Sequence, residues 1–239
     1  MKRLGVNIDH IATLRNARGE GHPDVIQAAK KVMQFGAHSI TVHLREDRRH
    51  IKDHDLLLLV KSKIPINLEM AANKKMLKIA LKRKPKYVCL VPEKREEITT
   101  EGGLNVSKNK KIIKNILIEL NKKKIRTSLF IDPNKKDIKL AKDLGSNCIE
   151  LHTGKISILI KKRKNYKSEL KKIINCTKYA KSLNLEVHAG HGIDYRTAKY
   201  LSKIKGIEEF NIGHFIIGES INIGLFNVIK RFKKIISIK

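Results

Sequence analysis

Strand-like and helix-like segments alternate along the whole chain, and this alternation constrains the fold more than any other feature. Eight short runs have the residue pattern of strands: LGVNID (4–9), SITVHL (39–44), INLEMA (66–71), YVCLVP (87–92), TSLFID (127–132), CIELHTG (148–154), LEVHAG (185–190) and EFNIGH (209–214). Amphipathic helices are expected between and after them, at residues 23–35, 53–63, 73–84, 108–124, 133–144, 166–183, 195–204 and 220–236. Repeated strand–helix units predict parallel strands with right-handed crossovers.

Eight such units in 239 residues match a (β/α)8 TIM barrel, an α/β fold, and we expect residues 1–239 to form it as a single domain. The alternative is a doubly wound open sheet, which would bury most strands on both faces. The pattern within the strands favours the barrel, because in several of them one parity is aliphatic and the other is polar. A barrel strand turns one parity to the helices and the other to the interior.

The polar parity places reactive side chains inside the expected barrel, mostly in the later half of each strand. It consists of Gly5, Asn7, Asp9, Thr41, His43, Arg45, Asn67, Glu69, Glu150, His152, Glu186, His188, Gly190, Asn211 and Gly213. Parallel barrel strands deliver their C-terminal ends to one rim, where active sites lie. A polar cavity at that rim explains why a strand can carry both His43 and Arg45. Glu186 comes early in its strand and is expected to have a structural partner.

Two glycine-containing stretches after the last two strands are typical of phosphate sites. They are AGHGID (189–194) and NIGHFIIG (211–218), where backbone amides and a helix N-terminus can contact an anion. The adjacent glycines of TTEGGL (99–104) suit a mobile lid. The loop RNARGEGHP (15–23) is expected to bring Arg15 or Arg18 over the rim as an anion clamp. His188 and His191 lie close in sequence, but no metal-ligand spacing occurs, and we expect no metal site.

The formal net charge of +29 raises the question of nucleic-acid binding. The charge comes mostly from lysines spread over helix-like segments, whereas base and phosphate recognition favour arginine. We therefore interpret the lysines as solvated surface, including a basic loop at residues 155–167, and expect neither a nucleic-acid nor a membrane partner. Three widely spaced cysteines form no metal or disulfide pattern, and no apolar run could span a membrane, so a cytoplasmic protein is expected.

These residues resemble a known family. GVNIDHIATLRNARG, ITVHLREDRRHI, NLEMA, LVPEKREEITTEGGL, ELHTG, AGHGI and NIGH, in this order, look like the pyridoxine 5'-phosphate synthase family. The resemblance extends from Gly5 to about Leu225. It implies a (β/α)8 barrel that condenses 1-deoxy-D-xylulose 5-phosphate with 3-amino-2-oxopropyl phosphate, forming pyridoxine 5'-phosphate and releasing phosphate and water. It also implies no organic cofactor, no required metal, and a homo-oligomer that is an octamer built from dimers.

The resemblance also implies roles for individual residues. His43 and Glu69 would accept protons, His191 would donate one, and Glu150 would stabilise the transition state. Deoxyxylulose-phosphate contacts fall on Asp9, His10, Arg45, His50 and Thr99. Contacts to the aminoketone phosphate fall on Asn7, Arg18, Gly192, Gly213 and His214. Histidine and glutamate suit the required proton transfers beside carbonyls and imines.

The effect of His188 and two alternative functions remain open from the sequence. His188 stands where this family more often has Asn, which affects the hydrogen bonding near His191. A phosphosugar epimerase or isomerase on the same barrel is the alternative function, and a bound divalent ion would favour it. Nucleic-acid binding is favoured by the charge alone, and salt-sensitive binding without His43 and Arg45 would support it.

Overall fold

A closed parallel barrel forms the centre of the protein in its computed structural model, which describes residues 1–93 and 102–237. Each strand pairs with its sequence neighbours, and β1 pairs with β8 to complete the ring. The (β/α)8 fold expected from the alternating segments is thus confirmed. The strands are β1 (Arg3–Asn7), β2 (Ser39–His43), β3 (Ile66–Ala71), β4 (Tyr87–Val91), β5 (Arg126–Ile131), β6 (Cys148–His152), β7 (Glu186–Gly190) and β8 (Ile207–Ile212).

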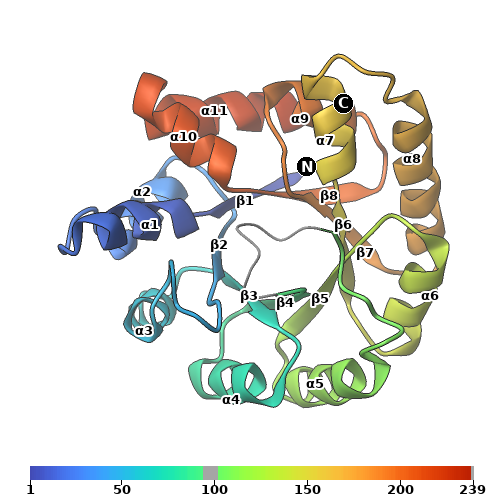
Figure 1. The fold of residues 1–239 in the computed structure, drawn as a ribbon, viewed down its shortest axis with the longest axis horizontal. Helices are drawn as coiled ribbons and strands as arrows, with labels where there is room; N and C mark the ends of the chain where they lie inside the picture. Colours follow the sequence, from blue (N-terminus) through green and yellow to red (C-terminus); the bar gives the residue numbers. More distant parts are fainter. Residues whose placement is uncertain (94–101, 238–239) are drawn as a thin grey trace.

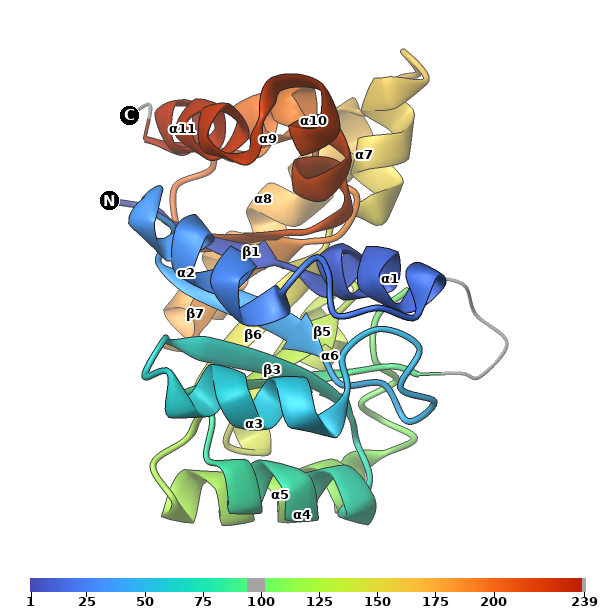
Figure 2. The ribbon, with the colours of Figure 1, turned by 90° about the vertical axis from the view of Figure 1, so that its left-hand side faces the viewer.

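Helices surround the strands on all sides (Figure 1), with α3, α4 and α5 on one flank and α10 and α11 on the opposite flank (Figure 2). Within the described residues they are α1 (Asp9–Arg18), α2 (Val25–Gln34), α3 (Asp53–Lys61), α4 (Lys74–Arg83), α5 (Lys110–Lys122), α6 (Lys135–Asp143), α7 (Gly154–Lys161), α8 (Lys167–Ser182), α9 (Tyr195–Leu201), α10 (His214–Ile223) and α11 (Leu225–Ile236). In the part of the chain that the structure describes, no helix is long and apolar enough to cross a membrane.

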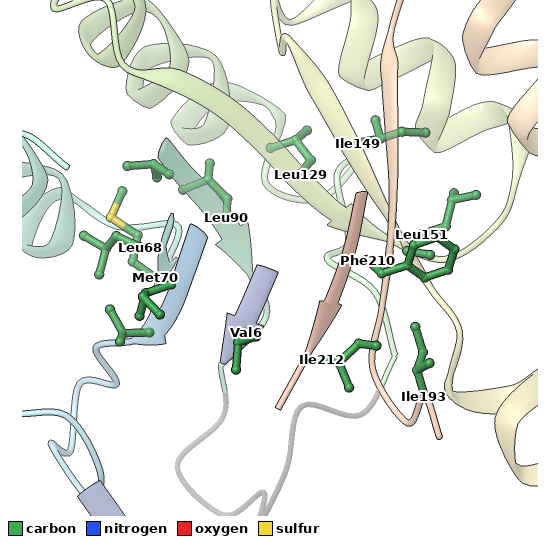
Figure 3. Packing of buried hydrophobic residues seen from close by; sticks show 14 of the residues in the cluster. Val6, Leu68, Met70, Leu90, Leu129, Ile149, Leu151, Ile193, Phe210 and Ile212 are labelled. Atoms are coloured by element: carbon green, nitrogen blue, oxygen red, sulfur yellow. The ribbon is translucent and has the colours of Figure 1, made fainter. Parts of the chain in front are cut away.

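The aliphatic parity of the strands packs against the helices and forms the main core. Val6, Leu68, Leu90, Ile149 and Phe210 are all completely buried there (Figure 3). Burial of one such side chain stabilises the fold by roughly 1.5–3 kcal/mol. This layer fixes which way each strand faces, because a slip of one residue would turn its apolar side chains into the polar interior.

The interior of the barrel also holds an apolar cluster that the polar pattern did not predict. Cys89 and Val91 of β4 and Phe130 of β5 are buried and form a group separate from the main core. These two neighbouring strands therefore supply the apolar wall of the interior, opposite to strands that supply polar groups.

Charged side chains close the other end of the interior, near the starts of the strands. Arg3 Nε donates to Glu209 Oε2 at 2.8 Å, and Arg126 Nη1 donates to Glu186 Oε1 at 3.0 Å. His188 lies between both carboxylates, with Nε2 at 2.7 Å from Glu186 Oε1 and Nδ1 at 3.6 Å from Glu209 Oε1. The expected structural partner of Glu186 is thus confirmed, and His188 belongs to the same ionic network.

This network bears on metal binding, because Cys148, Glu186 and His188 place one ligand atom each within 4.8 Å of one another. Burial alone would lower the pKa of His188, but its interactions with Cys148, Glu186 and Glu209 raise it to about 10. A metal-ligating imidazole must be neutral. Since Glu186 already pairs with Arg3 and Arg126, the cluster is better suited to a protonated histidine than to a cation.

The prediction of a loop at residues 15–23 is wrong for its first four residues. Residues 15–18 complete helix α1, which ends at Gly19 with a left-handed φ of 73°. Arg15 Nη2 donates to Asp55 Oδ2 at 2.8 Å, so Arg15 joins α1 to α3 and does not act as a clamp over the rim. Helix propensity in NIDHIATLRNAR was masked by the strand immediately before it.

The prediction of a solvated loop at residues 155–167 is also wrong for most of this stretch. Residues 154–161 form α7, in which Ile156, Ser157 and Ile160 are buried. The lysines concealed an apolar stripe at helical spacing.

The prediction of a single helix at residues 220–236 is wrong in two respects: the structure has two helices here, and the first begins before residue 220. Helix α10 starts at His214, directly after β8, and Gly224 separates it from α11 with a φ of 79°. The stretch NIGHFIIG is therefore a strand end followed by a helix N-terminus, which is the geometry expected of an anion site.

Candidate active site

A cavity of about 310 Å³ opens at the C-terminal ends of the strands. Its wall contains all the predicted site residues except two: Asn7, Asp9, His10, His43, Arg45, His50, Glu69, Glu150, His191, Gly192, Gly213 and His214. They come from β1, β2, β3 and β6, from the start of α1, the loop after β2, the turn after β7 and the start of α10. The inward parity of the strands brings His43, Glu69 and Glu150 together, as the sequence pattern predicted.

The two exceptions are Arg18 and Thr99. Arg18 lies at the end of α1 outside the cavity wall, and its Nη2 is 3.3 Å from Glu20 Oε1, with 78% of the side chain exposed. Its contact to the aminoketone phosphate stays a prediction. Thr99 lies outside the described residues, as does the first part of the predicted lid at 99–104.

Two carboxyl groups line the cavity, those of the buried Glu150 and the partly exposed Glu69. Glu150 is almost fully buried, and its Oε2 accepts a 2.6 Å hydrogen bond from Asn211 Nδ2. Burial raises the pKa of Glu150 to about 7, although His188 and Asn211 act to lower it. Burial, with the charges of Glu150 and Asp9, raises the pKa of Glu69 well above its ordinary value. Near neutral pH the pair therefore holds at least one proton that can be moved.

Close packing around Glu150 depends on Gly190 at the end of β7. A Cβ atom at position 190 would lie 1.9 Å from Glu150 Oε1. The side chain of Glu150 could not keep its present position beside any larger residue at position 190. The inward glycine of AGHG thus makes room for a catalytic candidate instead of contacting a phosphate.

His43 is held at the end of β2 from two sides. Its backbone N–H donates to Asp9 Oδ1 at 2.9 Å, and Asn7 Nδ2 donates to Asp9 Oδ2 at 2.8 Å. On the ring, Nε2 lies 3.4 Å from Glu93 Oε2. Burial alone would raise the pKa of Glu93, but His43 and the Glu46 amide outweigh it and lower the pKa. An ionised carboxylate beside an imidazole is the usual arrangement for a histidine that accepts a proton.

His191 occupies a strained position in the turn after β7. Its φ of 75° lies in the left-handed region, which is uncommon for a residue with a side chain. The ring centroid is 4.9 Å from that of His152, whose Nδ1 is 3.0 Å from Asp132 Oδ1. Burial, then the charges of His152 and Lys161, lower the pKa of His191 to about 4. The imidazole is thus neutral at neutral pH while the cavity is empty.

A second group of histidines lines the opposite side of the cavity. His10 lies edge-on to His214 with ring centroids 4.8 Å apart, and 5.9 Å from His50. Burial and then the charges of His10 and Arg45 lower the pKa of His50 to about 4. Arg45 itself is buried with 3% exposure. The Arg45 guanidinium supplies a positive charge here, and the imidazoles of His10 and His50 can donate hydrogen bonds, so this group of residues favours binding of an anion.

Three further residues of this region escaped the sequence analysis. Glu93 faces His43, Phe130 forms part of the apolar wall, and Lys161 reaches the cavity edge from the end of α7. The inward parity of β5 could have identified Phe130. Glu93 follows β4 in a loop, whose path no periodicity predicts. Lys161 ends α7, the helix that was interpreted as a solvated loop.

Structural similarity supports the barrel architecture. The Pyrococcus furiosus tryptophan synthase A-subunit superposes with a TM-score of 0.62, covering 99% of this chain and 98% of the other at 14% identity. A chain of the Amycolatopsis orientalis BexX/CysO complex superposes with a TM-score of 0.65, covering 99% and 88% at 11% identity. At such low identity these likenesses show the fold alone.

Sequence similarity identifies the family. The model of the pyridoxal phosphate biosynthesis protein PdxJ matches residues 4–238. The pyridoxine 5'-phosphate synthase of Pelagibacter ubique is 63% identical over 236 residues, covering 98% of this chain and 99% of the relative. That of Zymomonas mobilis is 52% identical over 232 residues, covering 97% and 90%. The chain therefore belongs to the PdxJ family of pyridoxal phosphate biosynthesis proteins.

Proposed function

We propose that this protein is a pyridoxine 5'-phosphate synthase, which condenses 1-deoxy-D-xylulose 5-phosphate with 3-amino-2-oxopropyl phosphate. Pyridoxine 5'-phosphate, phosphate and water are the products. The observation that carries the proposal is the single rim cavity in which Glu69 and Glu150 lie on the floor and His43 and His191 line the wall. The pyridoxine 5'-phosphate synthase of Pelagibacter ubique shares 63% of the sequence over nearly the whole chain.

The carboxyl pair suits a substrate that carries an amine. Burial raises the pKa values of both Glu69 and Glu150, because it removes water from around the charged carboxylates, and neighbouring acidic groups add to the shift. A substrate ammonium or an iminium intermediate would supply a cation and favour ionisation of the pair. Glu150 would then stabilise the developing positive charge, and Glu69, once ionised, would accept a proton.

The histidines complete the proton transfers. His43, backed by Glu93 at 3.4 Å, is the stronger candidate for a proton acceptor. In the described part of the chain, Asp132 contacts His152 and not His191. Binding of a phosphate dianion near His191 would raise its pKa and allow it to act as the donor.

The two phosphorylated substrates would bind to two adjoining groups of residues in the cavity. Arg45, His10 and His50, with Asp9, form one group suited to the deoxyxylulose phosphate. Gly192, Gly213 and His214, with Asn7, form the other, where the N-terminus of α10 offers backbone amides to the aminoketone phosphate.

Assembly and location are part of the same proposal. We expect a homo-oligomer, an octamer built from dimers, in the cytoplasm. Ile221 is 77% exposed on α10 and Phe226 is 42% exposed on α11, an apolar surface that assembly could cover. Cys89, Cys148 and Cys176 are free and buried, in keeping with a reducing compartment.

The activity can be tested with dialysed protein and chromatographic detection of pyridoxine 5'-phosphate. Product should form with both substrates and not with either alone. Glu69→Gln should reduce turnover by about 10²–10⁴-fold, the usual effect of losing an acid–base group. Glu46→Gln, on an exposed side chain of the nearby loop, should leave turnover unchanged. Absence of product with both substrates would refute the proposal.

A further inference from the structure

We propose that Lys161 is a phosphate-binding residue of this active site, which contacts the phosphoryl group of the aminoketone substrate beside Gly192. The inference rests on the proposed function for the identity of the substrate. It concerns a residue in the basic stretch 155–167 that the sequence analysis interpreted as solvated surface. Its basis is the way α7 is attached to the turn after β7.

One face of α7 follows that turn along its whole length. Thr153, Ser157 and Lys161 are four residues apart and therefore lie on one side of the helix. Thr153 Oγ1 donates to the carbonyl oxygens of both Gly190 and His191 at 2.8 Å. Ser157 packs so closely on Gly192 that a Cβ atom there would lie 3.1 Å from the Ser157 Cβ.

Lys161 completes this stripe at the cavity edge. Its Nζ donates to the Gly192 carbonyl oxygen at 2.9 Å, and the residue lines the cavity. An ammonium has three N–H donors, and the carbonyl accepts one of them. Its position beside the backbone of Gly192 leaves the others free to reach a phosphoryl oxygen that the same turn binds.

The neighbouring basic residues serve as a natural comparison. Lys162 caps α7 and Arg163 follows it in a left-handed conformation, so the chain turns away from the cavity. Neither residue lines the cavity, although both are exposed and carry the same charge as Lys161. A general effect of surface charge would be shared by all of them, whereas a direct contact belongs to Lys161 alone.

The charge of Lys161 also affects His191. Among the described residues, the charges of His152 and Lys161 act on this imidazole after burial and lower its pKa, while Asp132 pairs with His152 and Glu150 lines the same cavity. A phosphate dianion bound to Lys161 would offset that charge. Loading of the aminoketone phosphate would then favour the protonated form of His191, which the donor role requires.

The test uses steady-state kinetics of the intact protein. Lys161→Gln should raise KM for the aminoketone phosphate about tenfold, the lower range for a charge-assisted bond at an exposed site. Its kcat and its KM for the deoxyxylulose phosphate should change less than about threefold. Lys161→Arg should recover most of the affinity, and Lys162→Gln should match wild type. A KM for Lys161→Gln within twofold of wild type would overturn the inference.

A binding measurement separates this inference from the proposed function. Inorganic phosphate is titrated into the wild-type protein while the His191 ring protons are followed by NMR, with His191→Asn used to assign them. The His191 signals should move toward the protonated position, and Lys161→Gln should weaken the apparent affinity about tenfold. If the wild-type protein makes no product but this difference holds, only the proposed function fails. Equal phosphate affinity in both proteins contradicts the role of Lys161.

Discussion

Replacing Glu150 with Gln should stabilise the protein at alkaline pH while impairing its chemistry. The pKa of Glu150 in the folded protein is about 7, against an ordinary value of 4.5. At 1.36 kcal/mol for each pKa unit, ionised Glu150 costs the folded state about 3 kcal/mol above pH 7. Gln keeps an oxygen to accept the Asn211 hydrogen bond but leaves its own N–H groups poorly paired. We therefore expect a net gain of about 1–3 kcal/mol.

The size of this effect changes with pH in a defined window. The folded state holds the Glu150 proton more tightly than the unfolded state, so its contribution to stability is fully present below pH 4.5. It is lost as the pH rises through about 7. The advantage of Glu150→Gln should therefore be small at pH 5 and largest at pH 8.5.

The matched control is Glu209→Gln, the same substitution in the same barrel interior. Burial alone would raise the pKa of Glu209, but His188, Arg3 and Arg126 outweigh it and lower the pKa. Its carboxylate therefore stabilises the folded state above the unfolded pKa, and that contribution is lost as the pH falls. Glu209→Gln should lose stability at pH 8.5.

Urea unfolding followed by circular dichroism gives both free energies of unfolding at pH 5 and 8.5. Protein concentration must be equal throughout, because assembly would add to the apparent stability. Shifts of opposite sign for the two variants at pH 8.5 support the electrostatic interpretation of the site. Destabilisation by both variants at pH 8.5 would refute it.

Three further outcomes are expected. Arg45→Lys should mainly raise KM, since an arginine–anion contact already exists in the ground state. His191→Asn should instead lower kcat by about 10²–10⁴-fold. Equal effects of both variants on KM would contradict these roles. Turnover should survive a chelator, because His and Glu suffice for the proton transfers; restoration by one divalent ion after a chelator-induced loss would show otherwise. Phe232→Ala should lower the free energy of unfolding, measured with urea, by about 3–5 kcal/mol. Phe232 is fully buried, and its ring lies 4.7 Å from that of Tyr195 and 5.9 Å from that of Phe215, between centroids. A loss below about 1 kcal/mol would mean that this cluster is poorly packed.

The strands and the cavity floor could be predicted because a strand has a simple period. Each inward residue follows from its neighbour two positions away, so His43, Glu69 and Glu150 were assigned to one interior without knowledge of any contact. The closed ring then brings together residues far apart in sequence. Asn211 and Glu150, for example, are 61 residues apart and joined by a 2.6 Å hydrogen bond.

Segments beyond the strand ends were predicted less well, for physical reasons. Helix α7 was not predicted because it lies in a stretch rich in lysine, which was interpreted as a solvated loop. The apolar stripe that includes Ile156 and Ile160 was therefore not recognised. The ion pair of Arg15 with Asp55 joins two helices whose relative placement depends on tertiary packing. The contact of Glu93 with His43 likewise depends on the path of a loop, which no local preference determines.

The surroundings of His188 explain what this residue does in the barrel interior. Its ring lies between Glu186 and Glu209 and carries a positive charge toward Glu150 on the adjacent strand. Removal of that charge would raise the pKa of Glu150 further. The residue therefore belongs to the electrostatic support of the site and not to the wall of the cavity.

The central claim is that the rim cavity itself condenses the two phosphorylated substrates. The most direct measurement quantifies pyridoxine 5'-phosphate and inorganic phosphate in the same quenched samples, for wild type and for Glu69→Gln. The account predicts equal molar amounts of both products from wild type and a parallel loss of both in the variant. Phosphate release without pyridoxine 5'-phosphate, or undiminished product from Glu69→Gln, would contradict it.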